Sequence, residues 1–195
     1  MADDPALFDK PTLRAALRAR RRRLAQACPD AAARAAALWP PGDLGSFAVV
    51  AGYAARGGEL DPAPLLARFV AAGARLALPV ALDRDAPLAF RAAGDAAAYT
   101  PDIFGIPGPP PGAPVLIPDL IIAPVLAFDR RGGRLGQGAG CYDRTLAALR
   151  AAGPVRVVGL AYAGQEVAAV PFDDHDQPLD AILTETGYSV VAKDM

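Results

Sequence analysis

The sequence has little cysteine, a single histidine and no long uncharged apolar run. Cys28 and Cys141 are its two cysteines, and His175 is its one histidine. Two cysteines make no disulfide framework and fit a reducing compartment, while one histidine disfavours Ser/His/Asp and Cys/His catalytic sets. No apolar run approaches the length of a membrane span, and the acidic N-terminus lacks the apolar stretch of a secretory signal. We therefore expect a cytoplasmic protein that does not enter a membrane.

An excess of charge of one sign is also missing. Lys and Arg together number 20 and Asp and Glu number 21, which gives a net charge of −1. A nucleic-acid-binding surface normally needs a marked basic excess, so no nucleic-acid partner is expected. A chain of 195 residues with 53% hydrophobic residues suits one domain with a sizeable core. We expect a monomer with a single domain over 1–195, in which 1–9 form a disordered tail.

Apolar segments of strand length alternate with helix-like segments along the chain. Branched and aromatic content predicts strands at 46–53, 75–80, 88–91, 120–123, 155–162, 181–185 and 188–191. Apolar spacing and capping residues predict helices at 10–27, 30–39, 61–73 and 141–149. Leu65, Leu66, Phe69 and Val70 are expected on the inner side of the third helix. The alternation predicts a three-layer α/β fold with a mostly parallel central sheet flanked by helices.

Glycine and arginine concentrate between the strand at 120–123 and the helix at 141–149. The loop has glycine at 132, 133, 136, 138 and 140, together with Arg130, Arg131 and Arg134. Backbone N–H groups beside glycines approach anions closely, and a helix N-terminus adds a partial positive charge. The loop lacks the Gly-Lys-Ser/Thr of a Walker A motif, and Cys141 stands where a dinucleotide fingerprint needs glycine. We interpret it as a phosphate-binding loop in preference to a flexible connection.

The same loop resembles the ATP-binding loop of 5-formyltetrahydrofolate cyclo-ligases, also called methenyltetrahydrofolate synthetases. The similar residues are Ala127-Phe128-Asp129, Gly133-Arg134-Leu135-Gly136 and Gly138-x-Gly140-x-Tyr142-Asp143-Arg144, and the resemblance extends over about Lys10 to Tyr188. It implies a Rossmann-like α/β scaffold. It also implies ATP- and Mg²⁺-dependent cyclisation of 5-formyltetrahydrofolate to 5,10-methenyltetrahydrofolate, with release of ADP and phosphate. The formyl oxygen would be phosphorylated, and N10 would then attack the activated carbon.

The resemblance assigns ATP to the N-terminal helix and the loop. The implied ATP-binding residues are Lys10, Arg14, Arg134, Leu135, Gly136, Gln137, Gly138, Ala139, Gly140, Cys141 and Tyr142. Arg134 and Arg144 are implied to be catalytic, because phosphoryl transfer depends on charge neutralisation and positioning. The remaining arginines of the helix are interpreted mostly as a solvated face; they are Arg18, Arg20, Arg21, Arg22 and Arg23.

Folate binding is assigned to two further loops. The implied folate-binding residues are Glu59, Phe104, Gln137, Gly138, Ala139, Gly140 and Cys141. Glu59 lies in the pattern Tyr53-x5-Glu59-x-Asp61, and Phe104 lies in the proline-rich segment 99–118, where little regular structure is expected. Considered alone, Glu59 could be a solvated acid and Phe104 a plug for the core. Pro62 and Gly108 depart from the residues usual in the family.

Asp143 and Asp176 are implied to hold magnesium. Asp143 lies in the first turn of a helix and Asp176 in an acidic turn beside His175. Both follow strand-end loops that should emerge at one edge of a parallel sheet, and Mg²⁺ needs few carboxylates. A capped or solvated turn is the alternative for Asp176. Ala139 replaces a glycine or lysine of the family, and Cys141 replaces an aromatic residue; we interpret Cys141 as a packing residue in preference to an activated thiol.

Two functions of other classes stay open at this point, because a fold does not fix a function. One is a relative that binds nucleotide or folate without turnover. The other is a sugar-phosphate or coenzyme A enzyme on a similar scaffold.

Overall fold

The structure, a computed structural model, describes residues 10–192, with side chains from Thr12 onward, and is built on a seven-stranded sheet. The strand order is β11-β10-β9-β6-β1-β2-β3. The bounds are β1 Val49–Ala51, β2 Arg75–Val80, β3 Ala89–Ala92, β6 Leu120–Pro124, β9 Arg156–Leu160, β10 Ala181–Thr184 and β11 Gly187–Val190. The inner strands pair in parallel, whereas β3 and β11 run antiparallel at the two edges. The predicted mostly parallel sheet is confirmed.

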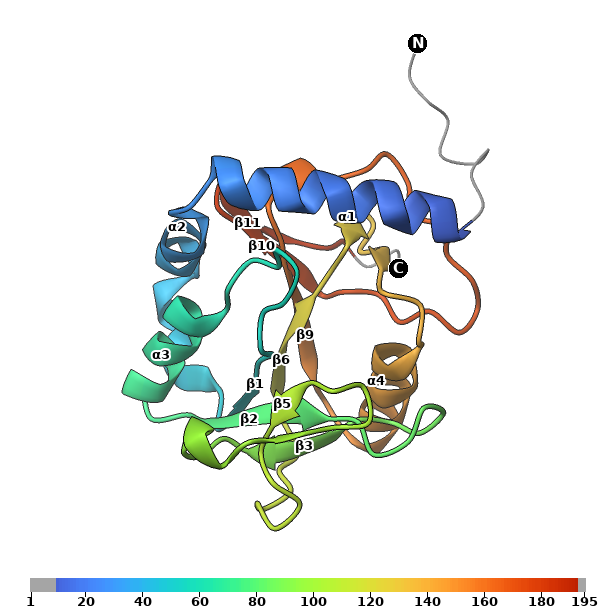
Figure 1. The fold of residues 1–195 in the computed structure, drawn as a ribbon. Helices are drawn as coiled ribbons and strands as arrows, with labels where there is room; N and C mark the ends of the chain where they lie inside the picture. Colours follow the sequence, from blue (N-terminus) through green and yellow to red (C-terminus); the bar gives the residue numbers. More distant parts are fainter. Residues whose placement is uncertain (1–9, 193–195) are drawn as a thin grey trace.

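Helices cover both faces of this sheet (Figure 1). They are α1 Lys10–Ala27, α2 Ala31–Leu38, α3 Ala63–Ala71 and α4 Cys141–Ala152. Phe69 of α3 packs in one core cluster with Ile122, while Leu146 of α4 packs in another with Ile121. Since successive strand residues point to opposite faces, neighbouring isoleucines serve the two cores. The predicted three layers are confirmed. Within residues 10–192, no helix combines the length and apolarity needed to cross a membrane.

Two local expectations were wrong. The strand expected at 46–53 spans only Val49–Ala51, and the Ala48 N–H just before it donates to the Asp119 carboxylate at 2.8 Å. Val70 is 50% exposed although it was expected on the inner side of α3. The helix buries Leu65 and Phe69 against the sheet, and Val70 follows on the outward face.

Short elements fill the long connections. Little regular structure was expected in the proline-rich segment 99–118, and it holds only the two-residue strands β4 (Thr100–Pro101) and β5 (Pro107–Gly108). The loop after β6 contains a small hairpin of β7 (Ala127–Phe128) and β8 (Arg134–Leu135), which its sequence did not reveal. The 3₁₀ helices are η2 Pro41–Ser46, η3 Ala96–Ala98 and η4 Ala163–Gln165.

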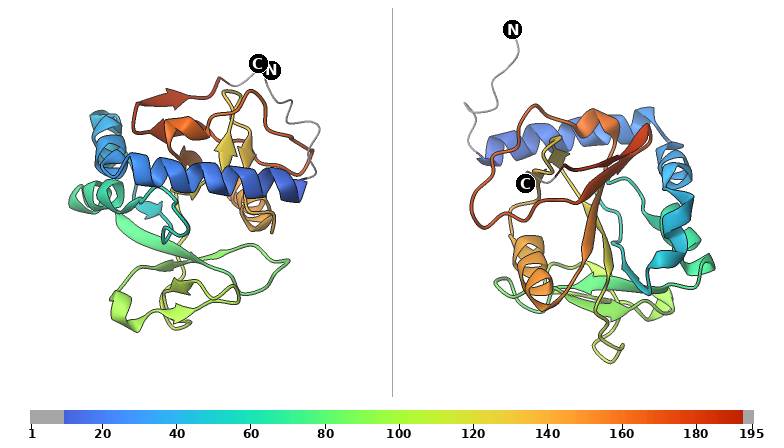
Figure 2. Two further views of the ribbon diagram at one scale, coloured as in Figure 1. Left: turned by 45° about the horizontal axis from the view of Figure 1, so that its top comes forward. Right: turned by 180° about the vertical axis from the view of Figure 1, so that it is seen from behind.

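The strand order reverses between β1 and β6. From β1 the chain passes through α3 to β2 on one side, and from β6 it passes through α4 to β9 on the other. The loops leaving the carboxyl ends of these two neighbouring strands therefore diverge, which is where open α/β sheets bind ligands. The long helix α1 lies across this end of the sheet (Figures 1 and 2) and packs on η4.

Candidate active site

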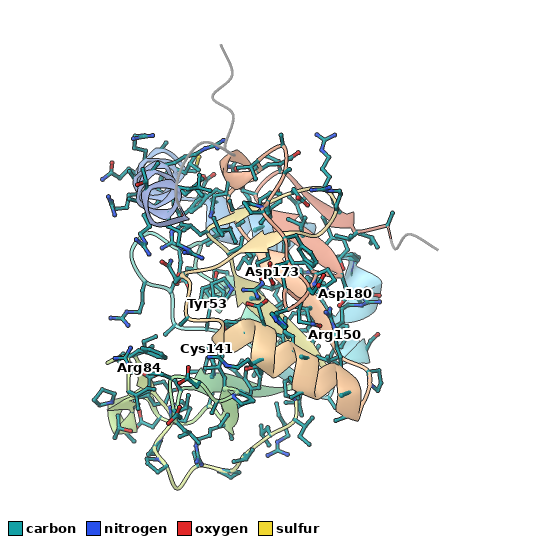
Figure 3. The ribbon with its side chains drawn as sticks, turned by 90° about the vertical axis from the view of Figure 1, so that its right-hand side faces the viewer. Tyr53, Arg84, Cys141, Arg150, Asp173 and Asp180 are labelled. Carbon is teal, nitrogen blue, oxygen red and sulfur yellow. The ribbon has the colours of Figure 1, made fainter. Side chains whose placement is uncertain are left out.

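A cavity of about 1050 Å³ lies at this edge of the sheet. Small-molecule sites usually measure about 300–1,000 Å³, so this cavity has the size for two ligands. It is lined by α1, by the loops after β1, β6 and β9, and by the segment around Phe104. Tyr53, Cys141 and Asp173 come from three of these segments and lie around it (Figure 3).

The cavity brings together the site residues predicted from the sequence. Those lining it are Arg14, Glu59, Phe104, Arg134, Leu135, Gly136, Gln137, Gly138, Ala139, Gly140, Cys141, Tyr142, Asp143, Arg144 and Asp176. The side chain of Lys10 lies outside the described residues. The roles given to these residues stay predictions, but their convergence from distant parts of the chain is a property of the fold.

Asp129 fixes the hairpin at the start of the glycine-rich loop. The residue is 1% exposed, and its carboxylate accepts backbone N–H groups of Arg131, Gly133 and Val170 at 2.9, 3.0 and 2.8 Å. Burial disfavours the charged form, but the N–H donors of Val170 and Gly133 and the Arg131 side chain prevail and lower the pKa of Asp129 below its ordinary value. The carboxylate therefore ties the hairpin to the segment that leads into the acidic turn.

Helix α1 is fastened to the glycine-rich loop by arginines. Arg14 Nε donates to the Gly136 carbonyl at 3.2 Å, and Arg18 Nε donates to Gln137 Oε1 at 2.9 Å. Gly138 has φ +105° and lies so close to Arg14 that an added Cβ would be 3.1 Å from Cζ. A side chain there would be strained and crowded. Arg18, grouped with a face interpreted mostly as solvated, is partly exposed and also contacts the loop.

Arg134 lines the cavity, and its positive charge is paired with the carboxylate of Asp143. Its side chain is 3% exposed, and Nη2 lies 2.5 Å from Asp143 Oδ1. Its guanidinium carbon is 5.5 Å from the centre of the Tyr142 ring. Burial raises the pKa of the Tyr142 phenol, and the nearby Arg134 charge opposes that rise only in part. Arg134 thus places its cationic group at the start of α4. An anionic phosphate bound there would contact both the guanidinium and the helix N-terminus.

Arg144 holds the last turn of the glycine-rich loop. Its Nη2 donates to the Ala139 carbonyl at 2.9 Å and to the Arg84 carbonyl at 2.6 Å. The Arg84 guanidinium carbon lies 5.3 Å from the centre of the Phe104 ring. Arg144 therefore links the loop to the segment that supports Phe104, which is half-buried at the cavity and not part of the core.

Cys141 and Gly140 form the junction between the loop and α4. Gly140 has φ +67°, a conformation that favours glycine. Cys141 is 8% exposed, with Sγ 3.8 Å from the Ala139 carbonyl oxygen. This burial supports the interpretation of Cys141 as a packing residue.

Glu59 is held in an ion pair. Arg21 Nη1 lies 3.2 Å from Glu59 Oε1, and the side chains are 4% and 13% exposed. Tyr53 OH donates to the Leu60 carbonyl and closes the loop around Glu59; burial and then the charge of Glu59 raise the pKa of Tyr53. The interpretation of Arg21 as part of a solvated face was wrong, because the loop after β1 covers it. The helical spacing of Arg14, Arg18 and Arg21 on one face of α1 was the signal that could have revealed this.

The acidic turn lies directly against Asp143. The Gln177 N–H donates to Asp143 Oδ1 at 3.2 Å, and the neighbouring Asp176 accepts the Asp173 N–H at 2.9 Å. Asp143 and Asp176 both line the cavity, and the residue that follows Asp176 contacts Asp143. Within residues 10–192, no three or more His, Cys, Asp or Glu side chains form a metal-binding group. Two carboxylates still suit Mg²⁺, which keeps several waters and takes its other oxygens from substrate phosphates.

Comparison with known proteins gives a consistent result. The model of the 5-formyltetrahydrofolate cyclo-ligase family matches residues 7–185. A 5-formyltetrahydrofolate cyclo-ligase of Mycolicibacterium smegmatis is 34% identical over 186 residues, which cover 90% of this chain and 93% of the relative. One of Escherichia coli (strain K12) is 35% identical over 132 residues, or 65% of this chain and 72% of the relative.

Two solved structures have a fold similar to that of this chain. The NMR structure of Aquifex aeolicus 5,10-methenyltetrahydrofolate synthetase superposes with a TM-score of 0.73 at 27% identity, covering 95% of this chain and 94% of that one. A 5,10-methenyltetrahydrofolate synthetase from Mycoplasma pneumoniae shares the fold, with a TM-score of 0.69 at 20% identity over 91% of this chain and 99% of that one. The match of the family model over most of the sequence, with a relative similar over nearly its full length, shows that this chain belongs to the 5-formyltetrahydrofolate cyclo-ligase family.

Proposed function

We propose that this chain catalyses the ATP- and Mg²⁺-dependent cyclisation of 5-formyltetrahydrofolate to 5,10-methenyltetrahydrofolate, with release of ADP and phosphate. The observation that carries the proposal is the single cavity in which the glycine- and arginine-rich loop meets Glu59 and Phe104. The glycine- and arginine-rich loop suits a polyphosphate. Glu59 and Phe104 suit a flat heterocycle with N–H donors. The names of the relatives support the same reaction.

ATP would lie between α1 and the glycine-rich loop. Arg14 contacts the Gly136 carbonyl, and Arg134 is buried beside the first turn of α4. Loop N–H groups, the helix N-terminus and these guanidinium groups together suit a chain of phosphates. Lys10, one turn before Arg14 in α1, would add a further cation.

The folate would place its pterin between Glu59 and Phe104. Glu59 offers carboxylate oxygens to the N–H groups of the ring, and Phe104 offers an aromatic face. Both lie on the same cavity as Arg134, so a formyl group on N5 could reach the γ-phosphoryl group.

The reaction requires a better leaving group on the formyl carbon. The formyl oxygen attacks the γ-phosphorus, the bond to the bridging oxygen breaks, and ADP leaves. N10 then attacks the formyl carbon, the carbon–oxygen bond breaks with release of phosphate, and the N10 proton is lost. Arg134 would neutralise charge on the transferred group, and Arg144 would hold the loop that positions it, since phosphoryl transfer relies on positioning and electrostatics.

Magnesium would be held by Asp143 and Asp176. Both contacts described for Asp143 use Oδ1, so among the described residues Oδ2 is the oxygen available to a cation. When bound, Mg²⁺ supplies neutralisation of the β- and γ-phosphate charge.

The test is formation of the methenyl product, followed by its absorbance, with the complete mixture and with ATP or Mg²⁺ omitted. The proposal predicts product only in the complete mixture. Binding of both ligands without product would instead identify a non-catalytic relative, and absence of binding would reject the proposal.

A further inference from the structure

Arg21 is a buried cation that the proposed mechanism does not use. It lies on α1 between Leu17 and Leu24, and its side chain is 4% exposed. Its Nε is buried and has no hydrogen-bond partner among the described residues. Burying a guanidinium is costly, and replacing a buried ion pair by apolar residues is often neutral or stabilising. Stability alone is therefore a weak reason for an arginine at this position.

The contacts of Arg21 converge on one short loop. Nη1 donates to Glu59 Oε1 at 3.2 Å, while Nη2 donates to the carbonyls of Gly57 and Arg56 at 3.2 and 3.4 Å. The planar guanidinium thus holds a side chain and two backbone groups of the loop at once. A lysine has the charge but not this fixed arrangement of donors.

Both oxygens of the Glu59 carboxylate are held by hydrogen bonds. Oε1 faces Arg21, and Oε2 accepts the backbone N–H of Arg56 at 3.0 Å. A carboxylate oxygen has two acceptor sites, so each oxygen keeps one for a ligand in the cavity. The orientation of Glu59 is set before a ligand arrives, which lowers the entropy cost of binding.

We propose that Arg21 is a positioning residue for folate recognition and that it acts through Glu59. The inference rests on the proposed function, because it requires Glu59 to accept hydrogen bonds from the pterin. Arg21 keeps the carboxylate aimed into the cavity, where it accepts hydrogen bonds from the ligand. The contribution of Arg21 is specific to the folate and independent of the nucleotide.

A second ion pair provides the matched control. Arg150 lies 3.1 Å from Asp180 and is 24% exposed, at the far end of α4 from the glycine-rich loop (Figure 3). It does not line the cavity. Like Arg21→Met, Arg150→Met replaces an arginine and removes its ion pair. Unlike Arg21→Met, it leaves the contacts of Glu59 unchanged.

The experiment measures binding of 5-formyltetrahydrofolate and of ATP by calorimetry in the intact chain. Arg21→Met should raise the Kd for the folate by about tenfold and leave that for ATP within about twofold. Arg21→Lys should give a smaller loss, which also keeps the test open if the methionine variant folds poorly. Glu59→Gln should weaken folate binding, and adding Arg21→Met to it should cause little further loss. Arg150→Met should leave the dissociation constant for the folate unchanged.

The outcomes separate this inference from the proposed function. If Glu59→Gln weakens folate binding but both Arg21 variants bind folate like Arg150→Met, Arg21 is structural and the inference alone is overturned. Equal losses for folate and ATP in the Arg21 variants would also overturn it. If Glu59→Gln binds folate as the unmodified chain does, the assignment of Glu59 fails and the inference fails with it.

Discussion

Arg134 Nη2 lies 2.5 Å from Asp143 Oδ1, so the arginine assigned to ATP phosphates and the aspartate assigned to magnesium neutralise each other. The Arg134 side chain is 3% exposed and that of Asp143 is 22% exposed. Binding of magnesium and ATP would give each partner a new counter-charge. The two residues consequently act as a unit, and replacing either one changes the environment of the other.

Asp143→Asn should depress turnover and raise the magnesium concentration required, because one carboxylate ligand is lost. It should also lower the free energy of unfolding by about 1–3 kcal/mol, since the buried Arg134 loses its charged partner. Titration of activity with magnesium and urea unfolding measure the two effects. Asp176→Asn is the control: it should raise the magnesium requirement with little loss of stability, because Asp176 lies in an exposed turn. Unchanged magnesium dependence in both variants would remove the metal assignment.

Lys10→Ala and Arg14→Ala should each raise the apparent KM for ATP far more than that for folate. Arg14 reaches the glycine-rich loop, and Lys10 lies one helical turn before it. Initial rates at varied ATP and varied folate provide the comparison. Arg23→Ala, an exposed position of the same helix, should leave both constants unchanged. Equal effects of Lys10→Ala and Arg23→Ala would exclude Lys10 from the site.

Asp102→Ala should weaken folate binding by displacing Phe104. The Asp102 carboxylate accepts the N–H groups of Ala81, Phe104 and Ile106 at 3.2, 2.9 and 2.9 Å. Its loss should also cost about 1–3 kcal/mol of stability, because the donors lose their acceptor. Phe104→Leu, by contrast, should weaken folate binding while leaving urea unfolding nearly unchanged. Normal folate binding in both variants would show that this turn does not contact the pterin.

Asp129 should make stability fall in acid. Its pKa is lowered in the folded state below the ordinary 3.8. Its contribution is therefore fully present above the unfolded pKa and is lost as pH falls below about 4 through the folded value. Asp129→Asn should cost about 2–4 kcal/mol near neutral pH, because three backbone donors lose a charged acceptor. Urea unfolding at several pH values should show a weaker acid dependence in the variant; equal slopes would contradict this role.

Local sequence signals predicted most of the elements. The branched runs at 120–123 and 155–162 gave the two neighbouring strands β6 and β9, and helix α1 has the predicted bounds. The glycine-rich loop was found by composition, and Glu59 and Phe104 by their resemblance to the family. Their presence in one cavity follows from the strand order, which composition and periodicity do not contain.

The interpretation failed where a long-range contact decides the role of a residue. Arg21 has the appearance of a surface arginine, and only the loop 35 to 38 residues away buries it. Asp129 was recognised as part of a motif, but its structural role depends on Val170, 41 residues further along the chain. No local pattern marks such a contact at Asp129, and at Arg21 the local signal is its helical spacing from Arg14 and Arg18.

The central claim is that the γ-phosphoryl group passes to the formyl oxygen inside the cavity that holds both the glycine-rich loop and Glu59. A direct measurement uses 5-formyltetrahydrofolate labelled with ¹⁸O in the formyl group and analyses the released phosphate by mass spectrometry. Transfer to the formyl oxygen predicts that the label appears in the phosphate in step with methenyl product. Unlabelled phosphate accompanying the methenyl product would contradict the account.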